Sequence, residues 1–259
     1  MTQIEFPNPN HASSDGLLAV GGDLKPSTLL LAYSQGIFPW FNPGQPILWW
    51  SPDPRLVLYP TNFKCSRSLK QILKSGQFRV TANTSFAQVL AACASRGASA
   101  VPQGYNLSAV ASLSRQDNAT ELHQAATWIT QDMQRAYLKM HELGAAHSIE
   151  VWQNKSLVGG LYGLKLGNAF FGESMFSVAS NASKVALAYL VYWAHQSQVH
   201  MIDCQITSDH LLSLGAKEIS RSDFLQQVKS YVRAVEPTDV QQIAGVVSQA
   251  SIENVINSL

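Results

Sequence analysis

Two acidic residues lie inside short apolar runs of this chain, and their placement constrains the fold more than any other feature. Residues 168–176 are an aromatic run that contains Glu173, and residues 199–205 are an apolar run that contains Asp203. Runs of this length between turn residues are typical of buried strands. Because side chains alternate along a strand, Asp203 and Gln205 are predicted to share one face.

A carboxylate within an apolar strand must be paired, hydrogen-bonded or functional, because an unpaired buried charge is costly. One interpretation is structural: Glu173, Asp203 and Gln205 form a polar network that ties two strands together. For a single acid we would favour that interpretation, since structural ion pairs also perturb acids. Two acids, one amide and a lining of aromatic and methionine side chains together favour a functional site.

The composition is that of a folded protein without a strong overall charge. With 259 residues, the chain can form one large domain or two small ones. Its 46% hydrophobic and 14% charged residues predict a packed core rather than disorder. The net charge is +1, so a nucleic-acid partner would have to meet a local basic patch.

The chain has three cysteines, Cys65, Cys93 and Cys204, without a CxxC pair or a cluster of histidines. A disulfide framework or a zinc site is therefore not expected. The N-terminus has no basic segment followed by an apolar one, and no apolar run approaches the length of a membrane span. We expect a cytoplasmic protein, with no membrane partner and no metal.

Residues 66–76 predict an amphipathic helix with Ser66 as its N-cap. Five basic residues and no acid occur between residues 61 and 80 of this nearly neutral chain. An ordinary solvated helix face is the usual explanation of a short charge run. The complete absence of acids favours phosphate contacts instead. The basic residues are Lys64, Arg67, Lys70, Lys74 and Arg79.

Residues 37–54 combine five Phe and Trp residues, Trp49 among them, with several prolines. Proline cannot continue a helix or occupy a central strand, so this segment is predicted to be a stiff aromatic loop. It could be a small aromatic core or a platform on which a base stacks, which contributes about 1–3 kcal/mol per base. Composition alone favours the aromatic core.

Several long and unusual sequence motifs follow one another along the chain. They are GLLAVGGDL (16–24), GIFPWF (36–41), ILWWSPDPR (47–55), WIT (128–130), HSIEV (147–151), FGESMFS (171–177), NASK (181–184), IDCQ (202–205) and SLGA (213–216). In these motifs the chain resembles the leucyl/phenylalanyl-tRNA–protein transferases over most of residues 6–225. The polar residues 95–126 depart from the family pattern and are interpreted as a surface insertion.

The resemblance implies an α+β fold with a GNAT-like acyltransferase core. We expect a small N-terminal α+β domain in residues 1–63 and the GNAT-like catalytic domain in residues 64–236. Residues 237–259 extend past the resemblance and are predicted to form a helical extension with a packing or dimer role. A monomer is the favoured oligomeric state.

The activity that the resemblance implies is transfer of Leu or Phe, and weakly Met, from aminoacyl-tRNA to a protein N-terminus. The acceptor protein would begin with Arg or Lys and would be marked for degradation, and no cofactor is required. Trp49 and Trp128 are implied to bind the aminoacyl-adenosine end. Arg67, Lys70, Lys74 and Arg79 match a basic segment that contacts tRNA. An apolar pocket for the Leu or Phe side chain is expected from Leu161, Phe170, Met175, Leu187, Leu190 and Ile202.

The aminoacyl ester is already activated, so positioning and proton removal can supply much of the rate. We hypothesise that Gln205 orients the attacking α-amine and that Asp203 accepts its proton through Gln205. Glu173 would hold the amine network or attract the basic side chain of the acceptor. A plain core remains an alternative for the apolar residues, most of all for Leu187 and Leu190.

Two other functions are compatible with parts of the sequence. An acyl-CoA-dependent N-acetyltransferase would need a glycine-rich loop before the helix that begins near residue 181, and residues 176–181 contain no glycine. A non-catalytic tRNA-binding module would account for the basic helix and the tryptophans. It would not account for Glu173, Asp203 and Gln205 in apolar strands.

Overall fold

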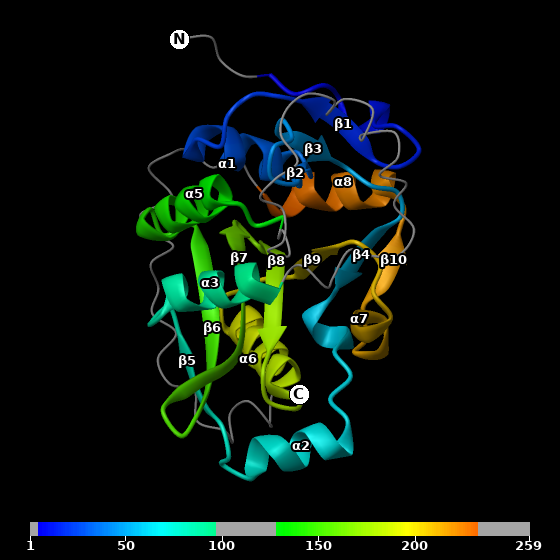
Figure 1. Ribbon diagram of the computed structural model, residues 1–259. Helices are drawn as coiled ribbons and strands as arrows, with labels where there is room; N and C mark the ends of the chain where they lie inside the picture. The colour runs from blue at the N-terminus through cyan, green and yellow to red at the C-terminus, as the bar shows by residue number, and fades with distance from the viewer. Residues whose placement is uncertain (1–4, 97–127, 233–259) are drawn as a thin grey trace.

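The computed structural model describes residues 5–96 and 128–232, which form a small and a large β-sheet (Figure 1). The small sheet has the antiparallel order β1-β3-β2, and the large sheet has the order β10-β4-β9-β8-β7-β6-β5. The strands are β1 (Leu17–Val20), β2 (Phe38–Pro39), β3 (Leu48–Trp50), β4 (Arg55–Leu58), β5 (Arg79–Ala82), β6 (Ala146–Gln153), β7 (Ser156–Leu166), β8 (Ala169–Ser177), β9 (Met201–Gln205) and β10 (Lys217–Ile219). This mixture of strands and helices confirms the predicted α+β class.

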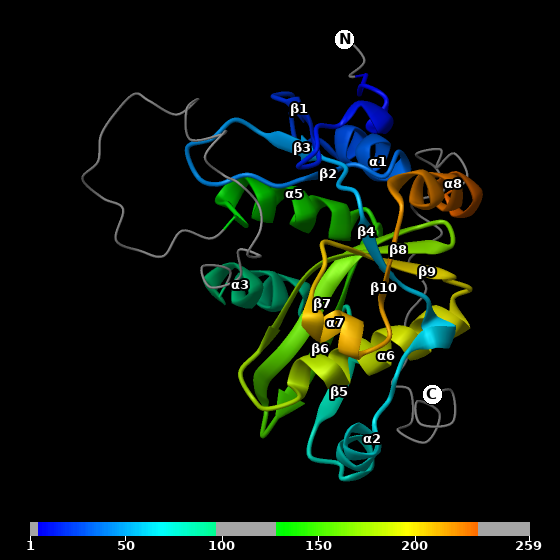
Figure 2. The same ribbon diagram turned by 90° about the vertical axis from the view of Figure 1, so that its right-hand side faces the viewer.

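Helices cover both faces of the large sheet (Figures 1 and 2). On one face, α3 packs on β6, β7 and β8, and α5 packs on β6 and against α1. On the other face, α6 packs on the same three strands and contacts α2. The helices are α1 (Pro26–Ser34), α2 (Arg67–Lys74), α3 (Phe86–Arg96), α5 (Gln131–Glu142), α6 (Ala182–Gln196), α7 (Asp209–Ser213) and α8 (Arg221–Tyr231).

The elements that matter for the site form where the sequence predicts them. The runs at 168–176 and 199–205 are β8 and β9, and the helix between them is α6. The basic helix is α2, whose first turn is capped because the Ser66 hydroxyl accepts a hydrogen bond from the backbone N–H of Leu69 at 3.2 Å. Leu69 and Leu73 are the buried side of this amphipathic helix.

Strand β4 lies in the large sheet, between β9 and β10, although its residues fall within the segment 1–63 expected to form the N-terminal domain. The small sheet, α1 and α8 lie together at one end of the molecule, and α2 lies at the opposite end (Figure 1). Residues 97–126 of the predicted insertion and the predicted extension 237–259 fall outside the described residues. Among the described helices, none is long and apolar enough to cross a membrane.

Strands β8 and β9 run parallel but pair over only a short stretch. The paired residues are Ala169–Phe171 on β8 and Met201–Asp203 on β9. Beyond this pairing, β8 continues alongside β7, whereas β9 continues alongside β4. Glu173 and Gln205 therefore lie where the two central strands have stopped pairing with each other.

Gly163 on β7 makes room for the ring of Phe170. A Cβ atom at Gly163 would lie 2.6 Å from Cε1 of Phe170 and would also clash with the carbonyl oxygen of Phe171. We expect Gly163→Ala to lower the free energy of unfolding by about 1–3 kcal/mol, because β7 and β8 cannot both keep their positions.

Gly172→Ala is the matched control, because Gly172 pairs with Gly163 across β7 and β8. The nearest atom to a Cβ at Gly172 is the carbonyl oxygen of Asp203, at an ordinary contact distance of 3.4 Å. Urea unfolding of the two variants should differ by more than about 1 kcal/mol. Equal stability would show that the Phe170 ring is not fixed by β7.

Candidate active site

A cavity of about 280 Å³ lies where β8 and β9 separate, beneath α6 and α7. Its polar lining includes Glu173, Gln205 and His210. The six apolar residues predicted to bind an aminoacyl side chain all line it: Leu161, Phe170, Met175, Leu187, Leu190 and Ile202. The cavity thus combines an apolar wall with a carboxyl group and an amide.

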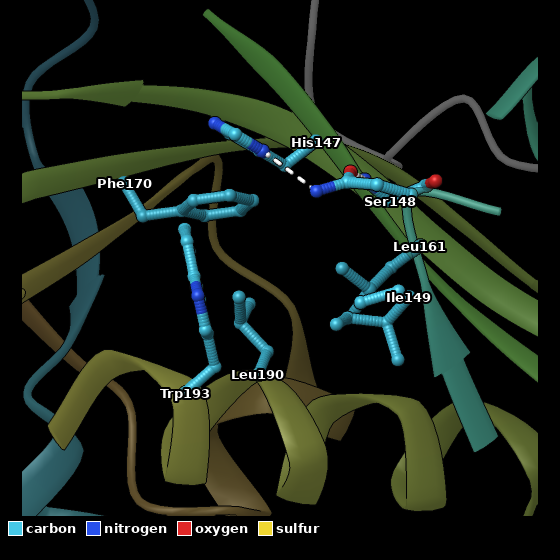
Figure 3. Close-up of a pocket in the computed structure, with 9 residues that line it drawn as sticks. His147, Ser148, Ile149, Leu161, Phe170, Leu190 and Trp193 are labelled. Atoms are coloured by element: carbon cyan, nitrogen blue, oxygen red, sulfur yellow. Dashed lines mark hydrogen bonds between the residues drawn. The ribbon is translucent and has the colours of Figure 1, made fainter. Parts of the chain in front are cut away.

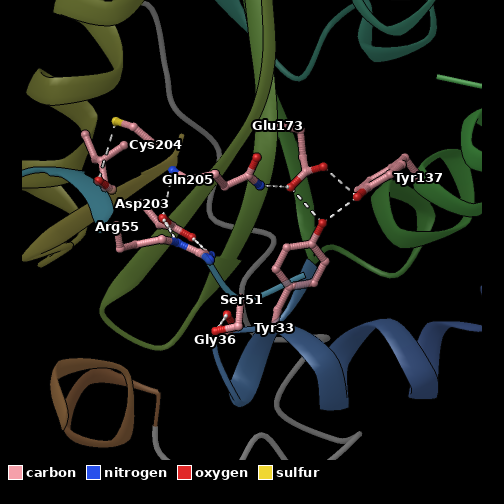
Figure 4. A network of polar contacts seen from close by, with 10 residues as sticks. Tyr33, Gly36, Ser51, Arg55, Tyr137, Glu173, Asp203, Cys204 and Gln205 are labelled. Carbon is pink, nitrogen blue, oxygen red and sulfur yellow. Dashed lines mark hydrogen bonds and ion pairs between the residues drawn. The ribbon is translucent and has the colours of Figure 1, made fainter. Parts of the chain in front are cut away.

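Glu173 is buried, with 8% of its surface exposed, and three groups donate hydrogen bonds to its carboxylate (Figure 4). The Tyr33 hydroxyl donates to Oε1 at 2.7 Å, and the Tyr137 hydroxyl donates to Oε2 at 2.6 Å. Gln205 Nε2 donates to Oε1 at 2.9 Å. Each oxygen of the carboxylate is therefore fixed by the protein, from α1, α5 and β9.

Burial raises the pKa of Glu173 from an ordinary value near 4.5 to about 7. Hydrogen bonds from Tyr137, Tyr33 and Gln205 favour the charged form and lower this pKa, and the negative charge of Asp203 raises it. Because the opposing effects leave the pKa near neutrality, Glu173 can both take up and release a proton at physiological pH.

Tyr33 and Tyr137 are site residues that the sequence analysis missed. Both are fully buried, and their hydroxyl groups also contact each other. Burial and the charge of Glu173 raise the pKa of both phenols well above the ordinary value, so they remain protonated donors. In the sequence, nothing distinguishes them from aromatic residues of the ordinary core.

Asp203 is fully buried and forms a bidentate ion pair with Arg55. Arg55 Nε donates to Oδ1 at 2.8 Å, and Nη2 donates to Oδ2 at 2.7 Å. The guanidinium carbon lies 4.7 Å from the ring centre of Phe38 and 4.4 Å from that of Phe224. Asp203 does not line the cavity. Arg55 was not predicted as a site residue either, although it is the last residue of the motif ILWWSPDPR (47–55).

Gln205 connects this ion pair to Glu173. Its backbone N–H donates to Asp203 Oδ1 at 2.9 Å, and its side-chain amide donates to Glu173. The residue has a φ of 63°, which is uncommon for a residue other than glycine, and it follows an irregularity in the β4–β9 pairing. Gln205 therefore bonds to both acids, to Asp203 through its backbone N–H and to Glu173 through its side chain (Figure 4).

The two tryptophans implied by the resemblance do not line this cavity. Trp49 is 1% exposed in the small sheet, donates from Nε1 to the carbonyl oxygen of Gly21 at 2.8 Å and packs edge-on against Phe6. Trp128 is half-buried against the core on the α1 and α5 side. In this structure Trp49 belongs to the aromatic core that composition alone favoured.

The predicted basic residues lie on the surface, at the end of the molecule far from the small sheet (Figure 2). Arg67, Lys70 and Lys74 project from α2. Arg79 begins β5, and its guanidinium carbon lies 5.4 Å from the ring centre of Trp152. Over residues 5–96 and 128–232, no three His, Cys, Asp or Glu side chains form a group that could hold a metal ion.

Comparison with known proteins identifies the family. The profile described as "Leucyl/phenylalanyl-tRNA protein transferase" matches residues 57–103 and 108–229, and that of its N-terminal domain matches residues 22–53. The leucyl/phenylalanyl-tRNA–protein transferase of Cellvibrio japonicus is 48% identical over 238 residues, which cover 91% of this chain and 90% of that protein. The protein of the same name from Desulfatibacillum aliphaticivorans is 49% identical over 225 residues, or 87% of each chain.

Similarity to solved structures is much weaker. A GCN5-related N-acetyltransferase from Kribbella flavida has a TM-score of 0.34 and 9% identity, over 75% of this chain and 61% of that one. A Staphylococcus epidermidis protein described as functionally unknown has a TM-score of 0.37 and 10% identity, over 79% and 68% of the two chains. The family assignment rests on the sequence matches, which extend over most of the chain: this chain belongs to the leucyl/phenylalanyl-tRNA protein transferase family of aminoacyltransferases.

Proposed function

We propose that the cavity between β8 and β9 binds the aminoacyl end of Leu-tRNA or Phe-tRNA, and that Glu173 takes the proton of the attacking α-amine. The observation that carries this proposal is a carboxyl group with a pKa of about 7 at the edge of an apolar cavity of about 280 Å³. This combination offers an apolar site for the side chain and a base for the amine.

In the proposed reaction, the α-amine of an acceptor protein attacks the ester carbonyl of the aminoacyl-tRNA. A C–N bond forms, the ester C–O bond breaks, and the tRNA leaves through its ribose oxygen. Glu173 takes the proton that the amine loses and can return it to that ribose oxygen. Good alignment of amine and ester can contribute about 7–11 kcal/mol, so a nucleophilic side chain is not required.

Asp203 takes a different part in this proposal from the one inferred from the sequence alone. Both its oxygens face Arg55, and Oδ1 also accepts the backbone N–H of Gln205. We therefore assign proton acceptance to Glu173 and assign Asp203 to positioning Gln205. Gln205 in turn orients the incoming amine and holds the Glu173 carboxylate.

We also propose the substrate range that the family resemblance implies. The acceptors are proteins that begin with Arg or Lys and are thereby marked for degradation in the cytoplasm. Weak transfer of Met is compatible with the cavity, because an apolar pocket distinguishes side chains by only about 1–3 kcal/mol per methylene group. The buried wall of Leu161, Leu187 and Leu190 carries no polar group that could reject Met.

The GNAT-like description of the core is likewise a proposal. It is supported by three antiparallel strands, β6, β7 and β8, followed by β9 parallel to β8 and separating from it around a cavity. An acyl-CoA substrate is disfavoured, because residues 176–181 before α6 offer no glycine-rich turn for a pyrophosphate. A tRNA-binding module without catalysis would not require a buried carboxyl group with a pKa near neutrality.

Glu173→Gln is expected to lower kcat for Phe transfer by about 10²–10⁴-fold, because the amide cannot accept the amine proton. For the wild-type protein, transfer should rise with pH through about 7 as Glu173 ionises. A second rise near pH 8 belongs to the acceptor amine itself and should survive in Glu173→Gln. The measurement is the pH profile of labelled Phe transfer to a peptide that begins with Arg.

Stability provides the control for this variant. The pKa of Glu173 is raised in the folded protein, so its ionisation weakens the fold as the pH rises from about 4.5 to 7. Glu173→Gln removes that effect and should unfold no more easily than the wild type at pH 8.

Tyr33→Phe should shift the lower limb of the pH profile of Phe transfer to higher pH, since the Tyr33 hydrogen bond lowers the pKa of Glu173. An unchanged profile in both variants would remove Glu173 from the chemistry.

Asp203→Asn is expected to cost about 3–5 kcal/mol of stability, because it leaves the buried charge of Arg55 unpaired. The double variant Arg55→Gln/Asp203→Asn removes both charges and keeps a carbonyl oxygen for the Gln205 N–H. It should recover part of the stability and retain transfer within about tenfold of the wild type. A double variant that is folded but inactive would show that the charge of Asp203 takes part in the reaction.

Lys70 and Lys74 are proposed to contact the phosphates of the tRNA acceptor end, together with Arg67 and Arg79. Lys70→Glu/Lys74→Glu should weaken tRNA binding and lower the slope of log affinity against log salt by about 1.4–1.8, for two lost phosphate contacts. The control variant Lys25→Glu/Lys155→Glu changes the net charge by the same amount at positions outside α2, and it should leave the slope unchanged. Equal slopes in both double variants would identify α2 as an ordinary solvated helix.

A further inference from the structure

We infer that a second, smaller cavity is a deep extension of the side-chain pocket, and that Leu190 closes the passage to it. Leu190 would thereby set the greatest length of the side chain that the protein transfers. The ligand of the extension is an apolar substituent at the para position of a phenylalanine side chain. This inference rests on the proposal that the larger cavity receives the aminoacyl side chain.

The second cavity has a volume of about 10 Å³, the space of about one water-sized group, and lies between α6 and the strands β5 to β8 (Figure 3). Three residues line both cavities: Leu161 from β7, Phe170 from β8 and Leu190 from α6. The two spaces are therefore neighbours, and these three side chains are the partition between them.

The partition lies opposite the groups proposed to act on the ester. The partners of Glu173 from α1 and α5, Tyr33 and Tyr137, belong to the core on one face of the large sheet. Leu161, Phe170 and Leu190 belong to the core on the other face, beneath α6. An aminoacyl group whose ester lies beside Glu173 and whose side chain enters the apolar wall therefore directs its far end at the partition.

The second cavity suits an apolar group, because its lining is mainly apolar and most of the polar side-chain atoms around it have hydrogen-bond partners. Asn83 Nδ2 donates to His147 Nδ1 at 3.0 Å, and Asn83 Oδ1 accepts the backbone N–H of Ser148 at 3.0 Å. The Ser148 hydroxyl donates to Glu150. The exception is the other ring nitrogen of His147, Nε2. Within the described ranges that nitrogen has no hydrogen-bond partner.

Leu190 is the part of the partition that can be shortened with the least disturbance. The Phe170 ring lies against Gly163, where β7 leaves no room for it to move toward that strand. Leu161 is on a central strand, whereas Leu190 projects from α6 toward both cavities (Figure 3). Shortening Leu190 to alanine opens the passage without changing either strand.

Leu187 provides a matched control on the same helix. Leu187 and Leu190 are both 2% exposed, and both line the larger cavity, but only Leu190 also lines the smaller one. Leu187→Ala and Leu190→Ala remove the same atoms from the larger cavity. They differ in whether the second cavity becomes accessible.

The test compares transfer of Phe, p-methyl-Phe and p-tert-butyl-Phe from chemically charged tRNA to an Arg-initiated peptide. We expect the kcat/KM ratio of p-tert-butyl-Phe to Phe to rise about tenfold or more in Leu190→Ala, and by less than about threefold in Leu187→Ala. Circular dichroism and thermal unfolding verify that both variants are folded. If either alanine variant is unfolded, the comparison is made with Leu190→Val and Leu187→Val. The larger rise in the kcat/KM ratio is again expected for the variant at Leu190.

The outcomes separate this inference from the proposed function. An equal rise in both variants would show that the side chain enters the larger cavity but that the second cavity is not its extension. No rise in Leu190→Ala with normal Phe transfer would likewise overturn the inference. If neither variant alters the transfer of any of the three amino acids, the side chain binds elsewhere and the proposed pocket itself is wrong.

Discussion

Arg55 and Asp203 bury a positive and a negative charge side by side, at the junction of the two sheets. The pair is fully enclosed, and the rings of Phe38 from β2 and Phe224 from α8 cover the guanidinium group. Such a pair contributes little net stability, because its attraction mainly offsets the cost of removing both charges from water. Its effect is positional: it fixes the end of β9, where Gln205 adopts its unusual backbone conformation and turns its amide toward Glu173.

Glu173 obtains its chemical character from the opposition between burial and hydrogen bonding. Burial alone would keep the carboxyl group protonated, and three donors from three elements would alone keep it ionised. Because neither effect dominates, the group titrates near neutrality while its oxygens stay in place. The same fold provides the apolar wall, since β8 and β9 separate immediately beyond Phe171 and Asp203 and leave the space that α6 and α7 cover.

Local sequence patterns predicted the strands that carry Glu173 and Asp203, and also a common side for Asp203 and Gln205. These predictions depend only on residues close together in the chain, through the alternation of side chains along a strand and the cost of burying a carboxylate. They did not predict Tyr33 or Arg55, which bond to residues 140 and 148 positions away in the chain. Contacts over such separations are set by how the layers pack, and a tyrosine in an apolar helix has the pattern of an ordinary core residue. For Trp49, composition alone favoured the aromatic core over the stacking platform, and the structure encloses this residue in the small sheet.

The hydrogen bond from Tyr33 to Glu173 joins the carboxyl group to α1, and the Tyr33 ring also packs edge-on against Phe171 of β8. Because this hydrogen bond lowers the pKa of Glu173, a movement of α1 away from β8 would raise that pKa. The acidity of Glu173 therefore depends on how closely α1 packs against the large sheet.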